Sequence, residues 1–177
     1  VPASAYLFIL VETSFYRSFR AFFDGIERGA PLSELDKAAS DIDRDARQTL
    51  LKTAAWQVFV TVLALAASQT VIEGLNLDTG QPWIVRLLLI GATFQVISMC
   101  ATLLLCYFDF QWEAMIAAGV LFIGNAGLTY FLDDVAPPGL GYALATALSS
   151  LTAVLLLQHR LANLVRDTYQ GQPYGNE

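Results

Sequence analysis

Long apolar stretches alternate with short polar connectors along most of the chain. The stretches cover about residues 50–72, 83–108, 110–132 and 139–158, and each contains at most one charged residue. A helix needs about 17–25 residues to cross roughly 30 Å of hydrocarbon, so each stretch has the length of a spanning helix. Buried helices of a soluble domain seldom reach this length four times in succession, and the sequence lacks the two-residue alternation of a membrane β-barrel. The pattern predicts an all-α fold, a polytopic transmembrane helical bundle with four full spans.

The connectors between the predicted spans carry turn signals and differ in charge from the two ends of the chain. Gly, Pro and Asp are concentrated in residues 74–82 and 133–139, which contain no Lys or Arg. Seven of the ten Lys and Arg lie between Arg17 and Lys52, and two more lie in residues 159–177. Cytoplasmic segments of membrane proteins are enriched in Lys and Arg. We therefore expect both ends of the chain in the cytoplasm, with residues 159–177 as a cytoplasmic tail.

Residues 1–11 (VPASAYLFILV) are apolar but too short to cross a membrane alone. They lack an initiating Met and the basic residues that begin a signal peptide. We expect them to be the end of a truncated transmembrane helix, so that the sequence is the carboxyl-terminal part of a longer polytopic protein.

Residues 12–49 show apolar positions at helical spacing, separated by charged ones. One stripe, in the segment SFYRSFRAFFDGIERG (residues 14–29), consists of Phe15, Phe19, Phe22, Phe23 and Ile26. A second stripe begins after Pro31 and runs directly into the first full span. The pattern predicts cytoplasmic amphipathic helices that either lie on the membrane surface or pack under the bundle. Their charged positions are expected to face water or a partner.

The composition of the chain also fits a membrane protein. Only 15% of the residues are charged and the mean hydropathy is +0.51, whereas about a quarter of the residues in a soluble domain are charged.

The charge of the chain argues against binding to nucleic acid. Between Glu12 and Lys52 there are eight acidic residues and seven basic ones. The net positive charge that would neutralise phosphates is therefore lacking.

Residues with reactive side chains are scarce. The sequence has no P-loop, no nucleophile-elbow motif and no zinc-protease motif. It contains one histidine, His159, and two cysteines, Cys100 and Cys106. The cysteines lie six residues apart on one predicted helix, about 9 Å along its axis, which is too far for a disulfide bond. We predict that the chain is not an enzyme and that it uses no cofactor and no metal.

Polar residues inside the predicted spans are the best candidates for functional contacts, because each is costly in lipid and tends to face the interior of a bundle. The candidates are Gln57, Gln69, Gln95, Ser98, Asn125, Thr129 and Tyr130. They either form hydrogen bonds between helices or line a polar transport path. Small residues at Gly141, Ala145 and Ser149 form a face that permits close approach of another helix.

Several segments in order resemble the carboxyl-terminal portion of the PelG family, inner-membrane components of the Pel exopolysaccharide export system. They read VETSFYRSFRAFFDGIERGAPLSEL, CYFDFQWEAM, FIGNAGLTYF, GLGYALATAL and LANLVRDTY. The family-motif positions in this chain are Glu12, Thr13, Phe15, Tyr107, Phe108, Asp109, Asn125, Gly141 and Tyr142. The chain departs from the family pattern after Asp109, where basic residues are usual, and near its carboxyl end, in residues 165–169.

The resemblance implies a fold and a function. The family is similar to multidrug (MATE) and polysaccharide flippases, with about twelve spanning helices in two bundles, so the four full spans would be the last four. It implies a subunit that helps export a hexosamine-containing exopolysaccharide across the bacterial inner membrane for the biofilm matrix. The implied partners are membrane lipids, the polysaccharide, other inner-membrane subunits and a cytoplasmic glycosyltransferase.

Two other functions stay open at this point. One is a flippase for lipid-linked oligosaccharides within the same superfamily, for which a strongly charged central cavity is expected. The other is a membrane scaffold that transports nothing and recruits a glycosyltransferase through its amphipathic segment. Export that is lost while synthesis continues favours a transporter, whereas loss of synthesis favours the scaffold.

Overall fold

The computed structural model describes residues 20, 24–26, 28–29, 31–74, 82–132 and 134–163. Within these residues four long helices are present: α3 (Leu32–Gly74), α4 (Pro82–Tyr107), α5 (Gln111–Leu132) and α6 (Leu140–Ala162). Each contains a segment long and apolar enough to cross a membrane. The described residues form no β-strand, so the predicted all-α fold with four potential spans is confirmed.

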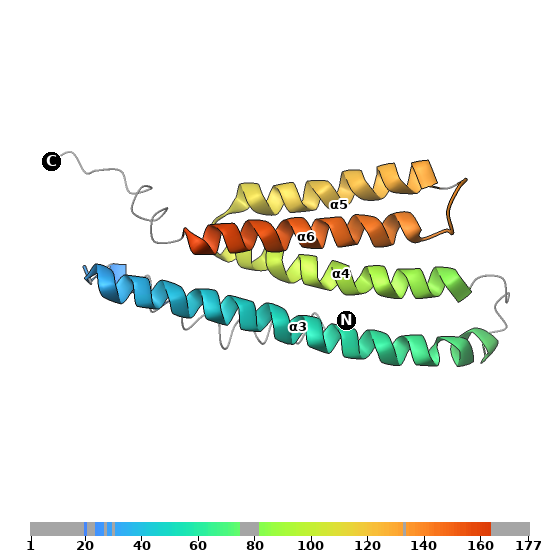
Figure 1. Ribbon diagram of the computed structural model, residues 1–177, viewed down its shortest axis with the longest axis horizontal. Coiled ribbons are helices and arrows are strands. Elements are labelled where there is room, and N and C mark those ends of the chain that lie inside the picture. Colours follow the sequence, from blue (N-terminus) through green and yellow to red (C-terminus); the bar gives the residue numbers. More distant parts are fainter. Residues whose placement is uncertain are drawn as a thin grey trace.

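The helices lie nearly parallel or antiparallel to one another (Figure 1). Helix α6 packs against both α4 and α5, and α3 packs mainly against α4. The end of the bundle at the α4–α5 turn, residues 108–110, is called the turn end below. The opposite end, at residues 133–139, is called the connector end.

The bounds of α4 and α5 differ by one residue from the predicted stretches, whereas α6 ends four residues later than predicted. Pro82 begins α4, where its missing N–H costs no helical hydrogen bond. The turn between α4 and α5 depends on Asp109, which has a positive φ of 61°. Asp is among the few residues that tolerate this left-handed conformation. Its carboxylate also accepts a 2.7 Å hydrogen bond from Gln111 Nε2.

Helix α3 continues without a break through the boundary expected near residue 50. No Gly or Pro lies between Leu32 and Glu73, so no residue in this range interrupts the helical hydrogen bonds. The Thr61 and Thr93 hydroxyls lie 2.7 Å apart, and the Cys100 thiol lies 3.9 Å from the Thr53 hydroxyl. This antiparallel register places Arg47 near the level of Tyr107, so the residues of α3 before Arg47 project beyond α4 (Figure 1).

The small residues of α6 allow α5 to approach it closely. A Cβ atom added at Gly141 would lie 2.7 Å from the Thr129 backbone nitrogen. The Ser149 hydroxyl donates a 3.0 Å hydrogen bond to the Ala117 carbonyl and lies 2.8 Å from the Ser98 hydroxyl. Backbone contact of this kind is typical of membrane helices, where small residues replace the hydrophobic driving force of water-soluble cores.

The best-buried apolar side chains lie toward the turn end, where α3, α4, α5 and α6 all contribute. They include Ile42, Ala46, Leu104, Leu105, Ala117 and Leu157, each with no exposed surface. Large apolar side chains elsewhere on the spans are exposed, as expected for helices that meet lipid or further protein. Helix α5 is the least buried of the four, since only 6% of its most apolar 18 residues are buried.

Candidate functional site

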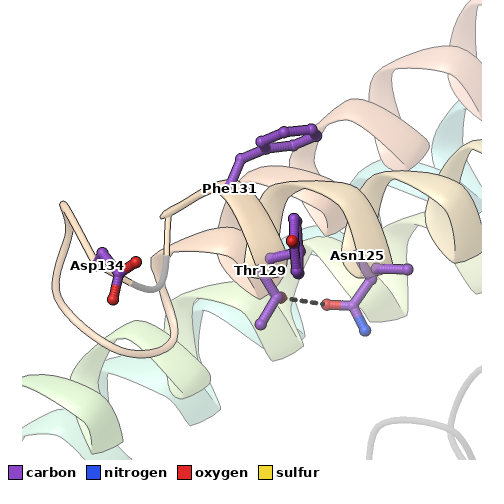
Figure 2. Close-up of a pocket in the computed structure, with 6 residues that line it drawn as sticks. Asn125, Thr129, Phe131 and Asp134 are labelled. Carbon is purple, nitrogen blue, oxygen red and sulfur yellow. Dashed lines mark hydrogen bonds between the residues drawn. The ribbon is translucent and has the colours of Figure 1, made fainter.

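Asn125, Thr129 and Tyr130 lie together on the exposed side of α5, toward the connector end. Tyr130 is 80% exposed, and Asn125 and Thr129 are also exposed. Asn125 and Thr129 are four residues apart, so they lie one above the other on the helix. Figure 2 shows them joined by a hydrogen bond, with Asp134 in the connector beyond the end of the helix.

These residues border a hollow of about 740 Å³. The hollow is lined by Asn125, Ala126, Thr129, Tyr130, Phe131 and Asp134. The rings of Tyr130 and Phe131 meet edge to face, with centroids 5.5 Å apart. The lining thus combines an amide, two hydroxyls, a carboxylate and two aromatic rings. Together these groups can donate and accept hydrogen bonds and offer apolar ring faces.

The position of Asn125 is unusual for a residue on the outside of a spanning helix. It lies seven residues before the end of α5, about 10 Å along the axis, which places it within the apolar segment. The hydrogen bond that its side-chain oxygen accepts from the Thr129 hydroxyl is 3.5 Å long, at the limit of such bonds. A polar group in hydrocarbon without good partners costs several kcal/mol. This side of α5 is therefore suited to contact with water, a polar ligand or more protein rather than lipid.

The other candidate residues lie elsewhere. Gln57 is buried and donates a 3.3 Å hydrogen bond to the Thr61 hydroxyl at the α3–α4 contact. Gln95 is partly buried and lines a separate groove between α4 and α5, which also contains Ser98. Gln69 lies on an exposed part of α3. The structure thus brings together Asn125, Thr129 and Tyr130 but separates Gln57 and Gln95 from them.

The family-motif positions that the structure describes are at helix contacts and turns. Gly141 lies against the backbone of α5, and the Tyr142 ring lies so close over Gly91 that an added Cβ would overlap a ring carbon. Phe108 is buried, Tyr107 packs on the core cluster, and Asp109 makes the α4–α5 turn. Glu12, Thr13 and Phe15, like Phe19 and Phe22, lie outside the described residues.

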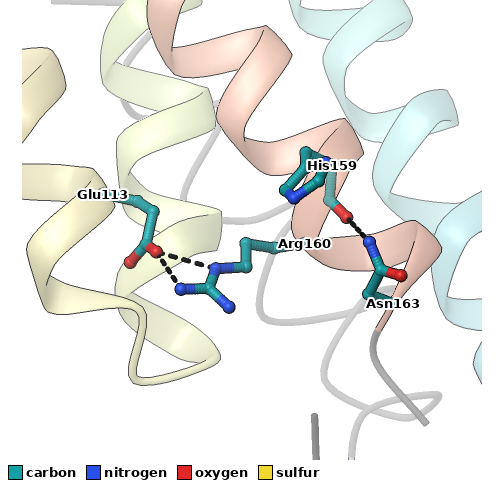
Figure 3. Close-up of polar contacts among 4 residues, drawn as sticks. All are labelled: Glu113, His159, Arg160 and Asn163. Atoms are coloured by element: carbon teal, nitrogen blue, oxygen red, sulfur yellow. Dashed lines mark hydrogen bonds and ion pairs between the residues drawn. The ribbon is translucent and has the colours of Figure 1, made fainter. Parts of the chain in front are cut away.

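An ion pair that was not predicted joins α5 and α6 at the turn end. Arg160 donates hydrogen bonds to Glu113 Oε1 through Nε, at 2.7 Å, and through Nη2 (Figure 3). The Glu113 side chain is 11% exposed and that of Arg160 is 35% exposed. The guanidinium carbon also lies 5.1 Å from the centre of the Phe110 ring, a cation–π contact. The signal in the sequence was a single charge of each sign near one end of two antiparallel spans.

Among the described residues, no group of three or more His, Cys, Asp or Glu is placed to hold a metal ion. What the hollow offers is hydrogen bonding and ring contact at the end of a spanning helix.

These features define a class of protein, a polytopic helical membrane protein with a polar surface on one of its spans. The family model described as "PelG: Putative exopolysaccharide Exporter (EPS-E)" matches residues 1–169. The chain therefore belongs to the PelG family of exopolysaccharide exporters, as the sequence motifs indicated. Members of this family are components of a transport system. Membership of the chain in this family and its four apolar helices together fit a membrane protein. Comparisons with curated proteins and with solved structures found no match.

Proposed function

We propose that this protein helps export a hexosamine-containing, Pel-type exopolysaccharide across the bacterial inner membrane, as a flippase-like transporter subunit without covalent chemistry of its own. The family supports a role in polysaccharide export. The observation that carries the proposal is the polar side of α5, where Asn125, Thr129 and Tyr130 lie exposed on a spanning helix. Sugars present many hydroxyls and apolar ring faces, and this lining complements both.

The proposed site lies where a polymer would leave the bilayer. The positions of the basic residues support a cytoplasmic turn end and an external connector end. In that orientation the hollow opens outside, and Asp134 contributes negative charge beside it. The proposed partners are other inner-membrane subunits and the cytoplasmic glycosyltransferase that makes the polymer.

Export assays on paired variants test this proposal. Asn125→Leu together with Thr129→Val removes the polar groups while keeping similar volumes. Each lost hydrogen bond weakens binding by about 1 kcal/mol, so we expect export to fall roughly tenfold or more. Tyr130→Phe should lower export less. Polymer outside the cells and inside them is measured separately and normalised to the amount of the protein in the membrane.

Matched controls come from the same bundle. Thr152→Val removes a hydroxyl that donates a 2.9 Å hydrogen bond to the Leu148 carbonyl of its own helix, and Tyr142→Phe removes a hydroxyl from α6. Both should leave export near the wild-type level. Wild-type export by the Asn125 and Thr129 double variant would refute a role for this surface in transport. Loss of polymer synthesis as well as export would favour the scaffold function instead.

A further inference from the structure

A narrow apolar groove runs along the bundle between α4 and α5, distinct from the hollow at the connector end. Its volume is about 310 Å³. The lining includes Gln95, Leu103 and Cys106 of α4, Ala118 and Leu121 of α5, and Ser149 of α6. The groove lies within the spanning segments, and it extends from mid-helix on α4 to Cys106, next to the turn end.

The groove follows from the close contact between α5 and α6. The small residues of α6 let α5 pack closely against it. Helix α6 contacts both α4 and α5 and forms the floor of the groove between them. The Ser98 and Ser149 hydroxyls at this floor bond to each other, and Ser149 also bonds to the Ala117 carbonyl. No buried side-chain polar atom in the described part of the chain lacks a hydrogen-bond partner. The floor therefore does not require water in the groove.

The length and lining of the groove fit one kind of occupant. Gln95 and Cys106 are eleven residues apart, about 16 Å along α4. The lining is mainly apolar and lies within the spanning segments, where the bilayer supplies acyl chains. An extended hydrocarbon chain is the thin, apolar component of a bilayer that fits.

A cation lies just beyond the turn-end limit of the groove. Ser149 and Arg160 are eleven residues apart on α6, close to three full turns, so they lie on the same face of the helix. The Ser98–Ser149 contact sets the level of α6 against α4, and it places Arg160 slightly past Cys106. About a third of the Arg160 side chain is exposed beside its bond to Glu113. A guanidinium at this end of the spanning helices complements the phosphate of a lipid headgroup.

We propose that the α4–α5 groove is a binding site for a bilayer phospholipid from the leaflet at the turn end. One acyl chain lies along Leu103, Ala118 and Leu121, and the phosphate lies near Arg160. The lipid fills the space that remains between α4 and α5 and so supports the position of α5. This site is independent of the polysaccharide that the protein transports.

Photo-crosslinking tests the site in the protein reconstituted into vesicles of phosphatidylethanolamine and phosphatidylglycerol. The probe is phosphatidylethanolamine with a diazirine in the middle of one acyl chain, and the labelled residues are mapped by mass spectrometry. Random contact with lipid predicts labelling that follows exposure, strongest at Ile123, which is 71% exposed, and also at Ile116, which is 49% exposed. A bound chain predicts labelling of the partly buried Leu103 and Leu121 that equals or exceeds labelling of these two isoleucines.

Two variants locate the lipid. Ala118→Phe fills the groove and should reduce labelling of Leu103 and Leu121 about fivefold, whereas Ile116→Phe, on another side of α5, should not. Replacing the cation alone with Arg160→Gln should weaken labelling of the groove roughly fivefold, the effect expected from one basic residue near an anionic surface. This second variant keeps the test valid if Ala118→Phe fails to fold.

Three outcomes would overturn the proposal. Labelling that follows exposure alone would show ordinary contact with bulk lipid. Labelling of Leu103 and Leu121 that persists in both variants would place the acyl chain elsewhere. Labelling of the groove by a polyprenyl-phosphate probe but not by the phospholipid would make the occupant a carrier of sugars rather than a structural lipid.

Discussion

Arg160 of α6 and Glu113 of α5 form a partly buried ion pair across the turn end of the bundle, in which one carboxylate oxygen accepts from two guanidinium nitrogens. The Glu113 side chain is only 11% exposed, so losing Arg160 leaves its carboxylate in a poorly solvated position. Removing one partner of a buried pair is costly, whereas replacing both can be nearly neutral.

The first prediction follows from that asymmetry. Arg160→Leu should lower the free energy of unfolding by roughly 1–3 kcal/mol, because Glu113 loses its hydrogen-bond donors. The double variant Glu113→Leu and Arg160→Leu should recover most of that loss. Thermal unfolding of the purified proteins in one detergent measures both. The exposed Asp43–Arg47 pair, at 2.9 Å, is the control, and Arg47→Leu should change stability by less than about 1 kcal/mol. A double variant less stable than Arg160→Leu would contradict this account.

The second prediction concerns two glycines with different surroundings. Gly141→Ala places a Cβ within 3 Å of the Thr129 backbone, which cannot move like a side chain. We expect a loss of roughly 1–3 kcal/mol and a lower melting temperature. Gly119 on α5 has no atom within 4 Å of an added Cβ, so Gly119→Ala should leave stability unchanged or raise it by up to about 1 kcal/mol. Equal effects at both positions would show that the α5–α6 contact is looser than described.

The third prediction concerns the turn between α4 and α5. Asp109 has a left-handed backbone, which costs residues with bulky side chains about 1–2 kcal/mol. Asp109→Val should therefore lower the melting temperature more than Asp109→Gly, which loses the bond to Gln111 but relieves the backbone. A glycine variant that is the less stable of the two would mean that the side-chain bond dominates.

The fourth prediction is the orientation of the bundle. In a Cys106→Ser background, which removes the exposed native thiol and keeps the buried Cys100, Asp134→Cys should react with a membrane-impermeant maleimide added to intact cells. Asp109→Cys and Asp41→Cys should react only after the membrane is opened. Residues 109 and 134 lie beyond opposite ends of α5. Comparing the labelling of these two positions therefore gives the orientation of this helix in the membrane. Labelling of position 41 or 109 in intact cells would reverse the proposed topology.

The fifth prediction concerns the aromatic segment before α3. Phe19→Ser together with Phe22→Ser should reduce export while the spans stay inserted, since burying one Phe contributes roughly 1.5–3 kcal/mol. Exchanging Arg20 and Asp24 should have little effect, because their groups are 4.0 Å apart and largely exposed. Export is measured for both variants and normalised to the amount of this protein in the membrane. Greater sensitivity of the charges than of the phenylalanines would indicate docking driven by charge.

The sequence was sufficient to predict the helices but not all of their contacts. Apolar runs and turn residues identified α4 and α5 to within one residue, because length and hydropathy depend on local composition. The unbroken course of α3 was less evident, since the charge pattern changes near Leu50 while the helix does not. The division of α3 into a cytoplasmic part and a span stays a prediction.

The candidate site was predicted only in part. The amide of Asn125 and that of Gln57 give the same signal in a sequence, a polar group in an apolar run. The structure separates them, because Gln57 faces α4 and bonds to Thr61, whereas Asn125 lies on the exposed side of α5. The Glu113–Arg160 pair could not be derived without knowing which helices are neighbours, since 46 residues lie between the two positions.

The continuity of α3 has a mechanical consequence. Its 43 residues form a rod of about 64 Å, and sharp bends in helices occur mainly at Pro, Gly or local defects, none of which is present between Leu32 and Glu73. The projecting part and the spanning part therefore form one continuous rigid helix. A displacement of the projecting part would be passed along α3 to its contact with α4 rather than absorbed at a joint.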